Sequence, residues 1–263
     1  MPTPDITTLT ADLRVLGGQR VWSLMISLFG DLAQGEHDGI DGPVLSTIMA
    51  ALEVKPEAAR VALHRLRNDG WITSAKTGRI SRHSLTPKGR ALSAAASPRI
   101  YTRPDEGPQD WQLVLLENTD LEAQTSLIAA GFKQITPRVF VGPTTPPLPK
   151  GALAMPGQPA PAWLQDQVGP RELAKDYANL HITLTTLAGA LPDPQMLNAL
   201  DTAVLRCLIV HNWRRLVLKH PLPPRALISD TAGFHLCHLI VADLLARFAR
   251  PALATIAQEQ ATL

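Results

Sequence analysis

Basic side chains concentrate in one short part of the chain. The 45 residues from Lys55 to Arg99 hold ten Lys or Arg and only two acids, a local excess of +8 in a chain whose net charge is +2. The other 218 residues therefore sum to −6. Guanidinium and ammonium groups at this density bind polyanions, most often the phosphates of nucleic acids. The chemistry that these residues indicate is phosphate binding.

No catalytic motif accompanies these cations. The sequence has no Gly-rich phosphate loop, no Gly-x-Ser-x-Gly turn, no His-Glu-x-x-His and no closely spaced pair of acids in a plausible cleft. We therefore predict that the protein is not an enzyme and takes no cofactor. Asp120 is the one candidate for a nuclease role, and we interpret it, or Thr119, as a helix cap. Two alternatives stay open: a nucleic-acid-processing enzyme, and a protein-docking module, that uses the basic region for targeting.

A helix at residues 56–68 is predicted to read the nucleic acid. Pro56 suits a first helical turn, and Gly70 suits the end. A 3.6-residue period places Ala59, Ala62, Leu63 and Leu66 on one inward stripe. The opposite face carries the candidates for base contacts, and its rim carries the candidates for phosphate contacts. These are Val61, His64, Arg65 and Asn68 for bases, and Arg60 and Arg67 for phosphates.

A cationic hairpin is predicted to follow this helix. Residues 71–74 and 82–86 can pair as antiparallel strands across the loop 75–79. Its three cations, Lys76, Arg79 and Arg82, are candidates for contacts with the phosphate backbone or an adjacent minor groove. Two amphipathic segments, 20–32 and 43–52, precede the helix. Three helices and a hairpin predict a winged helix-turn-helix, in which the second helix of the turn motif enters the major groove.

The remaining segments predict an α+β multidomain protein with three domains. A linking helix at 87–97 ends before Pro98. A small ferredoxin-like α/β domain follows, with predicted strands at 111–116, 138–142, 152–155 and 181–186 and helices at 120–130 and 170–179. Two apolar helices, 195–219 and 234–249, indicate a helical C-terminal domain and a dimer interface. The predicted domains are 1–97, 98–190 and 191–263.

The residues and their order resemble one family. Leu28-Phe29-Gly30-Asp31 closes the first long helix, the run from Arg60 to Leu66 precedes Gly70-Trp71-Ile72, and Arg99-Ile100-Tyr101 precedes Trp111. This order and spacing resembles the PaaX-type transcriptional repressors over more than half of the chain. Trp213-Arg214-Arg215-Leu216 and His220-Pro221-Leu222-Pro223-Pro224 are similar to that family's final domain, although His220 replaces its usual Asp. The segment 230–233 keeps only the Gly of the family's Trp-Pro-Gly turn.

The resemblance implies a homodimeric repressor that binds a double-stranded DNA operator of a catabolic operon, for phenylacetate or related aromatic compounds. It also implies relief of repression by an acyl-CoA effector, phenylacetyl-CoA in the founding members, which shifts the dimer to a geometry that no longer matches the half-site spacing. Arg214, Arg215 and Lys219 are candidate ligands for the effector's phosphates. Their plainer interpretation is favourable charge at a helix C-terminus.

The other titratable residues predict no metal site and a reducing compartment. His235, Cys237 and His238 lack a second ligand pair at suitable spacing, so we interpret the histidines as core or interface residues. Cys207 and Cys237 lack a close pairing motif and are predicted to be reduced, buried thiols. No run of 18 apolar residues and no signal peptide is present. We therefore predict a cytoplasmic protein that does not bind membranes.

Overall fold

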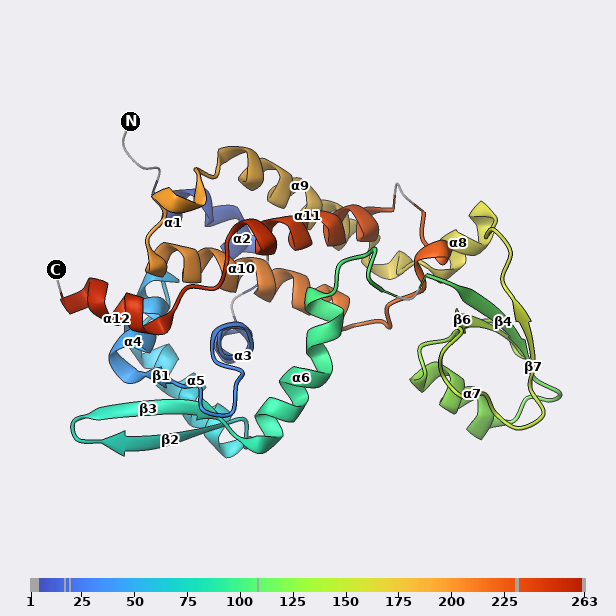
Figure 1. Ribbon diagram of the computed structural model, residues 1–263, viewed down its shortest axis with the longest axis horizontal. Coiled ribbons are helices and arrows are strands. Elements are labelled where there is room, and N and C mark those ends of the chain that lie inside the picture. Colours follow the sequence, from blue (N-terminus) through green and yellow to red (C-terminus); the bar gives the residue numbers. More distant parts are fainter. Residues whose placement is uncertain (1–4, 17, 19, 108, 230–231, 262–263) are drawn as a thin grey trace. The chain divides into compact units, whose positions relative to one another are not determined.

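Helices dominate the chain, which also forms two small antiparallel sheets (Figure 1). The computed structural model describes residues 5–16, 18, 20–107, 109–229 and 232–261. The chain forms two compact units: unit 1 takes in residues 1–100, 182–215 and 241–263, and unit 2 takes in residues 101–181 and 216–240. The mixture of helix and antiparallel sheet agrees with the predicted α+β class. The three domains predicted at 1–97, 98–190 and 191–263 stay a prediction.

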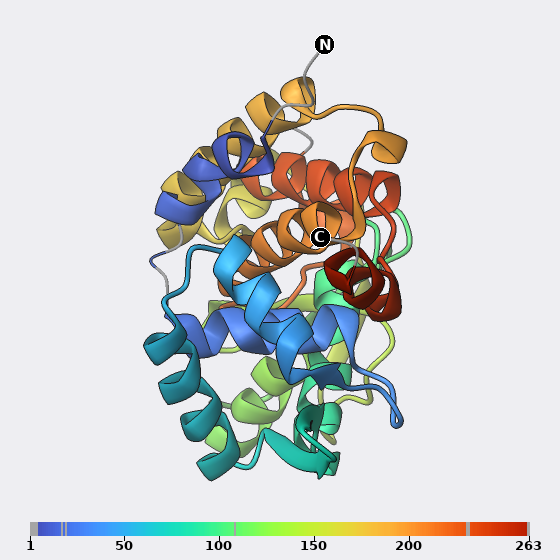
Figure 2. The same ribbon diagram turned by 90° about the vertical axis from the view of Figure 1, so that its left-hand side faces the viewer.

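Unit 1 holds the predicted winged helix-turn-helix (Figure 2). Its N-terminal elements are α1 (Ile6–Leu9), α2 (Ala11–Leu16), α3 (Val21–Leu32), β1 (Ile40–Asp41), α4 (Gly42–Ala51), α5 (Pro56–Asn68), β2 (Ile72–Thr77), β3 (Ile80–Leu85) and α6 (Pro87–Tyr101). The predicted helices at 20–32, 43–52 and 56–68 are confirmed as α3, α4 and α5. In α5, Ala62 and Leu66 are buried and Ala59 and Leu63 are partly buried, as the apolar stripe predicts.

The hairpin strands are longer than predicted. Strands β2 and β3 pair from Ile72↔Leu85 to Thr77↔Ile80, so the predicted five-residue loop 75–79 is wrong. A two-residue turn, Gly78-Arg79, replaces it, and Gly78 has the positive φ of 62° that such a turn favours at its first position. The short strand β1 pairs with β3 and completes a three-stranded sheet of order β1-β3-β2. Strand β1 has only two residues, which are too few to show a strand pattern in the sequence.

The linking helix is also longer than predicted. Helix α6 continues through Pro98 to Tyr101, so the helix end expected before Pro98 is wrong. Proline removes one N–H donor but does not forbid the helical φ, and Ser97 donates its hydroxyl to the Ser93 carbonyl in the preceding turn. Near the other end of α6, Gly89 packs directly on the hairpin. A Cβ at this position would collide with the carbonyl oxygen of Trp71.

The C-terminal part of the chain returns to unit 1. Its elements are α9 (Ala174–Ala190), the 3₁₀ turn η2 (Pro194–Met196), α10 (Ala199–Val217), α11 (Gly233–Arg247) and α12 (Leu253–Ala261). The boundary between the two units falls inside α9, α10 and α11, so each of these helices contributes residues to both units. Helices α10 and α11 confirm the two long C-terminal helices predicted at 195–219 and 234–249.

Unit 2 contains a four-stranded antiparallel sheet of order β5-β6-β4-β7. Its elements are β4 (Trp111–Leu115), α7 (Leu121–Ala129), β5 (Lys133–Thr136), β6 (Val139–Pro143), β7 (Leu153–Pro156), α8 (Ala162–Val168) and the 3₁₀ turns η1 (Arg171–Leu173) and η3 (Arg225–Leu227). A ferredoxin-like repeat has a helix between its third and fourth strands. Here β7 follows β6 without one, and α8 comes after β7. The element order therefore differs from the prediction.

The predicted strand at 181–186 is wrong, because these residues lie in α9. Its β-branched residues, such as Ile182 and Thr183, favour a strand locally. The apolar positions continue instead at helical spacing: Tyr177, Leu180, Leu184 and Leu187 are all buried. Burial along one helical face therefore outweighs the local strand preference. Strand β5, which the prediction omitted, is mostly exposed and has little apolar alternation.

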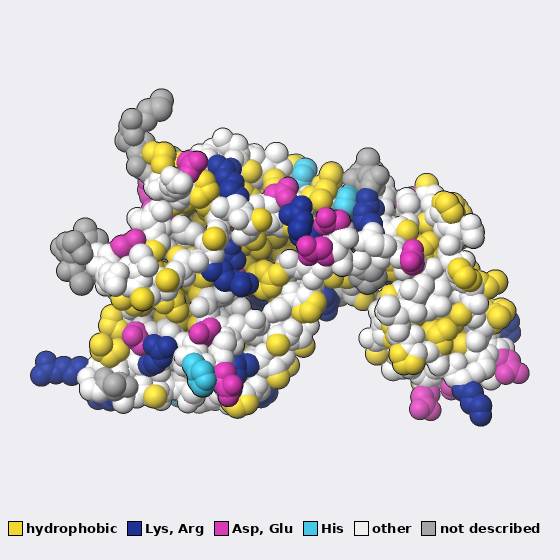
Figure 3. All heavy atoms as spheres, viewed as in Figure 1, with side chains coloured by type: hydrophobic (Ala, Val, Ile, Leu, Met, Phe, Trp, Pro, Cys, Tyr) yellow, Lys and Arg dark blue, Asp and Glu magenta, His cyan; other side chains and the backbone are white. Residues whose placement is uncertain are grey.

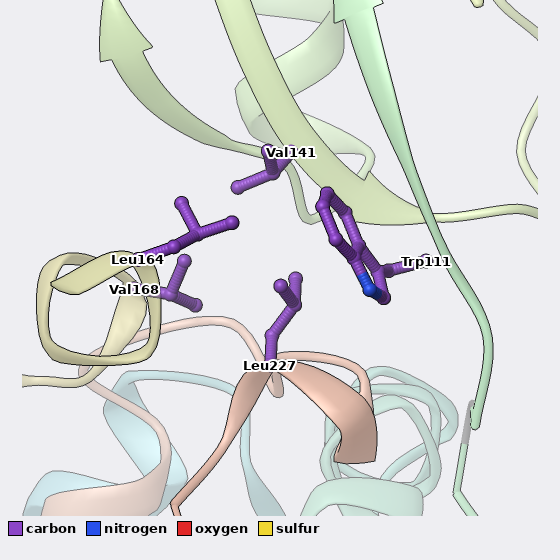
Figure 4. Close-up of a cluster of buried hydrophobic side chains, with 5 residues drawn as sticks. All are labelled: Trp111, Val141, Leu164, Val168 and Leu227. Atoms are coloured by element: carbon purple, nitrogen blue, oxygen red, sulfur yellow. The ribbon is translucent and has the colours of Figure 1, made fainter. Parts of the chain in front are cut away.

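The core of unit 2 covers both faces of its sheet. Trp111 and Val141 from the sheet meet Leu164, Val168 and Leu227 from α8 and η3 (Figure 4). Trp111 also donates its indole N–H to the carbonyl of Gln158 at 3.0 Å. A second cluster packs α7 on the sheet: Val114, Leu116, Leu127, Phe132 and Phe140. Residues of unit 2 thus pack on both faces of the sheet.

Candidate nucleic-acid interface

The outward face of α5 presents the four residues predicted to contact bases. Val61 has 70% of its surface exposed, although it is apolar and lies in the middle of a helix. His64, Arg65 and Asn68 are exposed as well. The amide of Asn68 lies 3.3 Å from Nδ1 of His64, one helical turn away. These polar groups and the Val61 methyls therefore form one accessible surface, which has the donors, acceptors and apolar contact that base edges require.

Two arginines flank this face and stay accessible. The guanidinium of Arg65 lies 4.6 Å from the centre of the Trp22 ring of α3 and 3.5 Å from the Asp69 carboxylate, with 55% of the side chain exposed. Arg60 lies 3.8 Å from Glu57 in a fully solvated pair. Exposed pairs of this kind contribute at most about 1 kcal/mol. Phosphates can therefore replace both carboxylates at little cost.

The hairpin holds its three cations differently. Lys76 on β2 and Arg79 in the turn are exposed, and a basic side chain projects from the tip of the hairpin in Figure 3. Arg82 on β3 donates to the Asp41 carboxylate at 3.2 Å and to the His37 carbonyl at 3.5 Å. Arg82 thereby ties β3 to β1. Among the predicted hairpin cations, Lys76 and Arg79 are the more accessible.

His83 supports the hairpin and was not among the predicted site residues. It is buried, and Nδ1 lies 2.8 Å from the hydroxyl of Ser74 on the paired strand. Burial, together with the nearby charge of Arg67, lowers the pKa of His83 below its usual 6.5. The ring is therefore mainly neutral at pH 7. Arg67 itself is exposed at the end of α5.

A buried ion pair anchors α3, on which α5 packs. Asp31 at the end of α3 accepts two hydrogen bonds from Arg206 of α10, each 2.8 Å long, and one from Arg250 at 3.0 Å. Arg206 also donates to the carbonyls of Leu245 and Phe248. Burial alone raises the pKa of Asp31, but the hydrogen bonds and charges of both arginines outweigh burial, so the net pKa is lowered. Asp31 therefore stays ionised and holds α3 to the C-terminal helices.

The three predicted effector ligands have different surroundings. Arg214 donates Nε to the Ser27 hydroxyl at 3.1 Å and Nη2 to the Ser23 hydroxyl at 2.8 Å, which ties α10 to α3. Arg215 is half-buried, and Lys219 is exposed beyond the end of α10. Arg214 thus has a structural role within unit 1 that the sequence did not indicate.

His211, His235, His238 and both cysteines are buried in the C-terminal part. Nε2 of His238 lies 2.7 Å from the Thr102 carbonyl, and burial raises the pKa of the Cys207 and Cys237 thiols. Over the described ranges, no group of three His, Cys, Asp or Glu side chains is arranged to hold a metal ion. In the same part of the chain, no helix is both long enough and apolar enough to cross a membrane. Asp120 accepts from the N–H groups of Glu122 and Ala123, which confirms it as the cap of α7.

Comparisons with known proteins agree with the family resemblance. Residues 20–89, which span α3 to the start of α6, match the family model described as PaaX-like protein. The chain is 25% identical over 272 residues to the Transcriptional repressor PaaX of Escherichia coli strain K12, across 91% of this chain and 84% of that relative. A solved structure, Uncharacterized protein Rv0674 from Mycobacterium tuberculosis, is similar in fold, with a TM-score of 0.51 and 16% identity over 91% of this chain and 97% of that one. Residues 20–89 of the chain are therefore similar to the PaaX-like family model, and most of the chain is similar to a PaaX repressor.

Proposed function

We propose that this protein is a DNA-binding transcriptional repressor whose winged helix-turn-helix binds an operator in double-stranded DNA. The observation that carries the proposal is the accessible face of α5, with Val61, His64 and Asn68 at its centre, flanked by Arg65 and by the exposed cations of the hairpin. This arrangement suits insertion of α5 into the major groove and contact of the hairpin with the backbone. The relative from E. coli, named a transcriptional repressor, supports the same function.

The proposed contacts divide by chemistry. Val61, His64 and Asn68 contact base edges, and Arg65 contacts bases and the adjacent backbone. The other cations, Arg60, Arg67, Lys76, Arg79 and Arg82, bind phosphates and position the helix. Because Arg82 also bonds to Asp41, we expect it to contribute less than Arg79.

The wider proposal includes the dimer, the effector and the regulated genes. We propose a homodimer that represses a catabolic operon for phenylacetate or a related aromatic compound, acts in the cytoplasm where its DNA is accessible, and is released by an acyl-CoA effector. The family resemblance supports this part of the proposal. Arg215 and Lys219 remain candidates for the effector's phosphates, whereas Arg214 would have to release two serines of α3 to join them.

The matched family and the matched repressor are not enzymes by their descriptions. The alternatives, a nucleic-acid-processing enzyme and a protein-docking module, make different predictions. A processing enzyme would change the DNA that it binds. If the protein is a docking module, charge reversal at Arg65 or Arg79 should leave its affinity for DNA unchanged.

Fluorescence anisotropy with the full chain and its own upstream promoter fragment tests the repressor. We expect the promoter fragment to bind more tightly than a random duplex, with an affinity that falls steeply as salt rises. Arg65→Glu and Arg79→Glu should each weaken binding about tenfold or more. Lys150→Glu, an exposed charge reversal in unit 2, is the matched control. Equal binding of both duplexes with no salt dependence would contradict the proposal.

A further inference from the structure

Unit 1 contains a cavity that the proposed DNA contacts do not use. It has a volume of about 420 Å³ and lies between α4, the first half of α5 and the tip of the β2–β3 hairpin. This volume falls within the range of small-molecule sites. The cavity opens beside the flank of α5 that carries Arg60, not on the face that carries Val61.

The interior of the cavity is aliphatic. Met25, Leu45 and Met49 lie beneath its surface, each at most 3% exposed. Leu63 of α5 and Ile80 of the hairpin add further apolar surface. The residues that line the cavity in the described part of the chain include no Phe, Tyr or Trp. The lining therefore offers no aromatic ring for stacking, and its accessible apolar side chains, Leu63 and Ile80, suit an aliphatic group.

The polar residues of the cavity carry positive charge or are neutral. Arg60 comes from α5 and Arg79 from the hairpin turn, and both side chains are exposed. Glu57, which pairs with Arg60 at 3.8 Å, is itself solvated and does not line the cavity. None of the lining residues that the structure describes is an acid. Two guanidinium groups over an apolar interior are complementary to an anion with an aliphatic body.

His83 adds one polar contact inside the cavity. Its Nδ1 is occupied by the Ser74 hydroxyl, and within the described residues no hydrogen bond to its Nε2 is found. Ser81 of the hairpin lines the same wall. These groups can hold a second ligand oxygen or a water molecule without adding charge.

We propose that this cavity binds an aliphatic monocarboxylate, with the carboxylate between Arg60 and Arg79 and the chain on Leu63 and Ile80. The ligand would engage two of the cations assigned to DNA phosphates. Ligand and DNA therefore weaken each other's binding by the same factor. This antagonism rests on the proposed DNA binding, whereas occupation of the cavity does not.

Isothermal titration calorimetry with octanoate and the full chain, without DNA, tests the site directly. We expect one saturable site per chain. Arg79→Gln should weaken octanoate binding about tenfold, because a charge-assisted contact is lost. Lys76→Gln, a hairpin cation that does not line the cavity, should leave octanoate binding unchanged. Absence of saturable binding, or equal binding by the Arg79→Gln variant, would overturn the proposal.

A second variant tests the cavity by filling it. Ala50 is exposed on α4 and lines the cavity, so Ala50→Phe should abolish octanoate binding without burying a new group in the core. Ala94→Phe places the same ring on an exposed position of α6 and should bind octanoate normally. Circular dichroism verifies that both variants are folded. Normal octanoate binding by a folded Ala50→Phe variant would overturn the assignment to this cavity.

Anisotropy with the promoter fragment then tests the antagonism. Octanoate should raise the Kd for DNA of the wild-type chain and of Lys76→Gln, but not of Ala50→Phe. Octanoate binding at this site with an unchanged Kd for DNA would overturn the antagonism. If the chain binds no DNA at all, the proposed function fails, and the calorimetry still decides the cavity site on its own.

Discussion

Asp31 is completely buried and accepts hydrogen bonds from two arginines. Asp31→Asn would leave Arg206 buried, with only 3% of its side chain exposed and no countercharge from Asp31. Removing one partner of a buried pair costs about 3–5 kcal/mol. We expect the free energy of unfolding, measured with urea at pH 7, to fall by that amount. Asp41→Asn breaks the exposed pair with Arg82 and should cost about 1 kcal/mol or less, and equal losses in both variants would contradict this account.

His211 makes stability depend on pH. Burial, and then the charges of Arg214 and Arg215, lower its pKa from 6.5 to about 4. Because the unfolded chain takes up this proton at higher pH than the folded chain, stability is lost as the pH falls from 6.5 towards 4. Below about pH 4 the destabilisation by His211 has reached its full value, and above about pH 6.5 His211 does not destabilise the folded chain.

His211→Phe should remove this pH dependence. Nε2 of His211 is buried without a hydrogen-bond partner, and in the variant the Ser27 hydroxyl keeps its hydrogen bond from Arg214. Between pH 6.5 and 4 we expect the free energy of unfolding to fall less for the variant than for the wild type. The difference in slope should be up to about 1.4 kcal/mol per pH unit. His64→Phe, at an exposed position, should follow the wild type. Parallel curves for wild type and His211→Phe would contradict the prediction.

The sequence indicated the exposed site residues better than the buried ones that support them. The face of α5 follows from a period of 3.6 residues, so Val61, His64 and Asn68 could be assigned to it before the structure. The pair of Asp31 and Arg206 joins residues 175 positions apart, and no local pattern encodes such a contact. Trp22 and His83 were missed for the same reason, since their partners lie on other elements.

At the scale of the element, the N-terminus of α7 tests the role of Asp120. Its carboxylate accepts from the N–H groups of Glu122 and Ala123, so Asp120→Ala should destabilise the chain by about 1 kcal/mol. Asp120→Ser retains a capping oxygen and should cost less. Urea denaturation measures both changes. A nuclease role would instead predict unchanged stability in Asp120→Ala and loss of a DNA-cleaving activity.

Elements with strong local signals were predicted well. Helix α5 has Pro56 at its start, an apolar stripe and Gly70 after its end, and its predicted bounds are those of the structure. The hairpin was recognised, but its loop was predicted too long, because Ala75 and Lys76 have a weak strand preference of their own and are held in the strand by pairing with Arg82 and Ser81. The strand predicted at 181–186 failed because burial along α9 decides its conformation.

At the scale of the whole molecule, unit 1 is assembled from three separate stretches of chain. Helix α10 bonds to the N-terminal stretch at several points: Asn212 to the Leu13 carbonyl, Trp213 to the Ile100 carbonyl and Arg206 to Asp31. Local periodicity does not reveal where a later helix packs, so these contacts could not be predicted from the sequence. These contacts make the N-terminal stretch dependent on α10.

A fragment of residues 1–100 should therefore be much less stable than the full chain. It lacks α10, leaves Asp31 without both arginines, and exposes apolar surface such as Leu24, whose carbonyl lies against Cys207. We expect a broad, non-cooperative thermal transition by near-ultraviolet circular dichroism, and promoter binding weaker than that of the full chain. A cooperative transition of the fragment at the midpoint of the full chain would show that α10 is dispensable.

The distance in sequence between Asp31 and its arginines affects when the protein becomes active. Arg250 follows Asp31 by 219 residues, and ribosomes add about 5–20 residues per second, so roughly 10–45 s separate the synthesis of these two partners. During that time the nascent winged helix lacks the groups that fix α3. We expect a chain truncated upstream of Arg206 to bind the proposed operator more weakly than the intact protein. The same ion pair that stabilises the fold would thus make the proposed DNA binding depend on translation of the last helices.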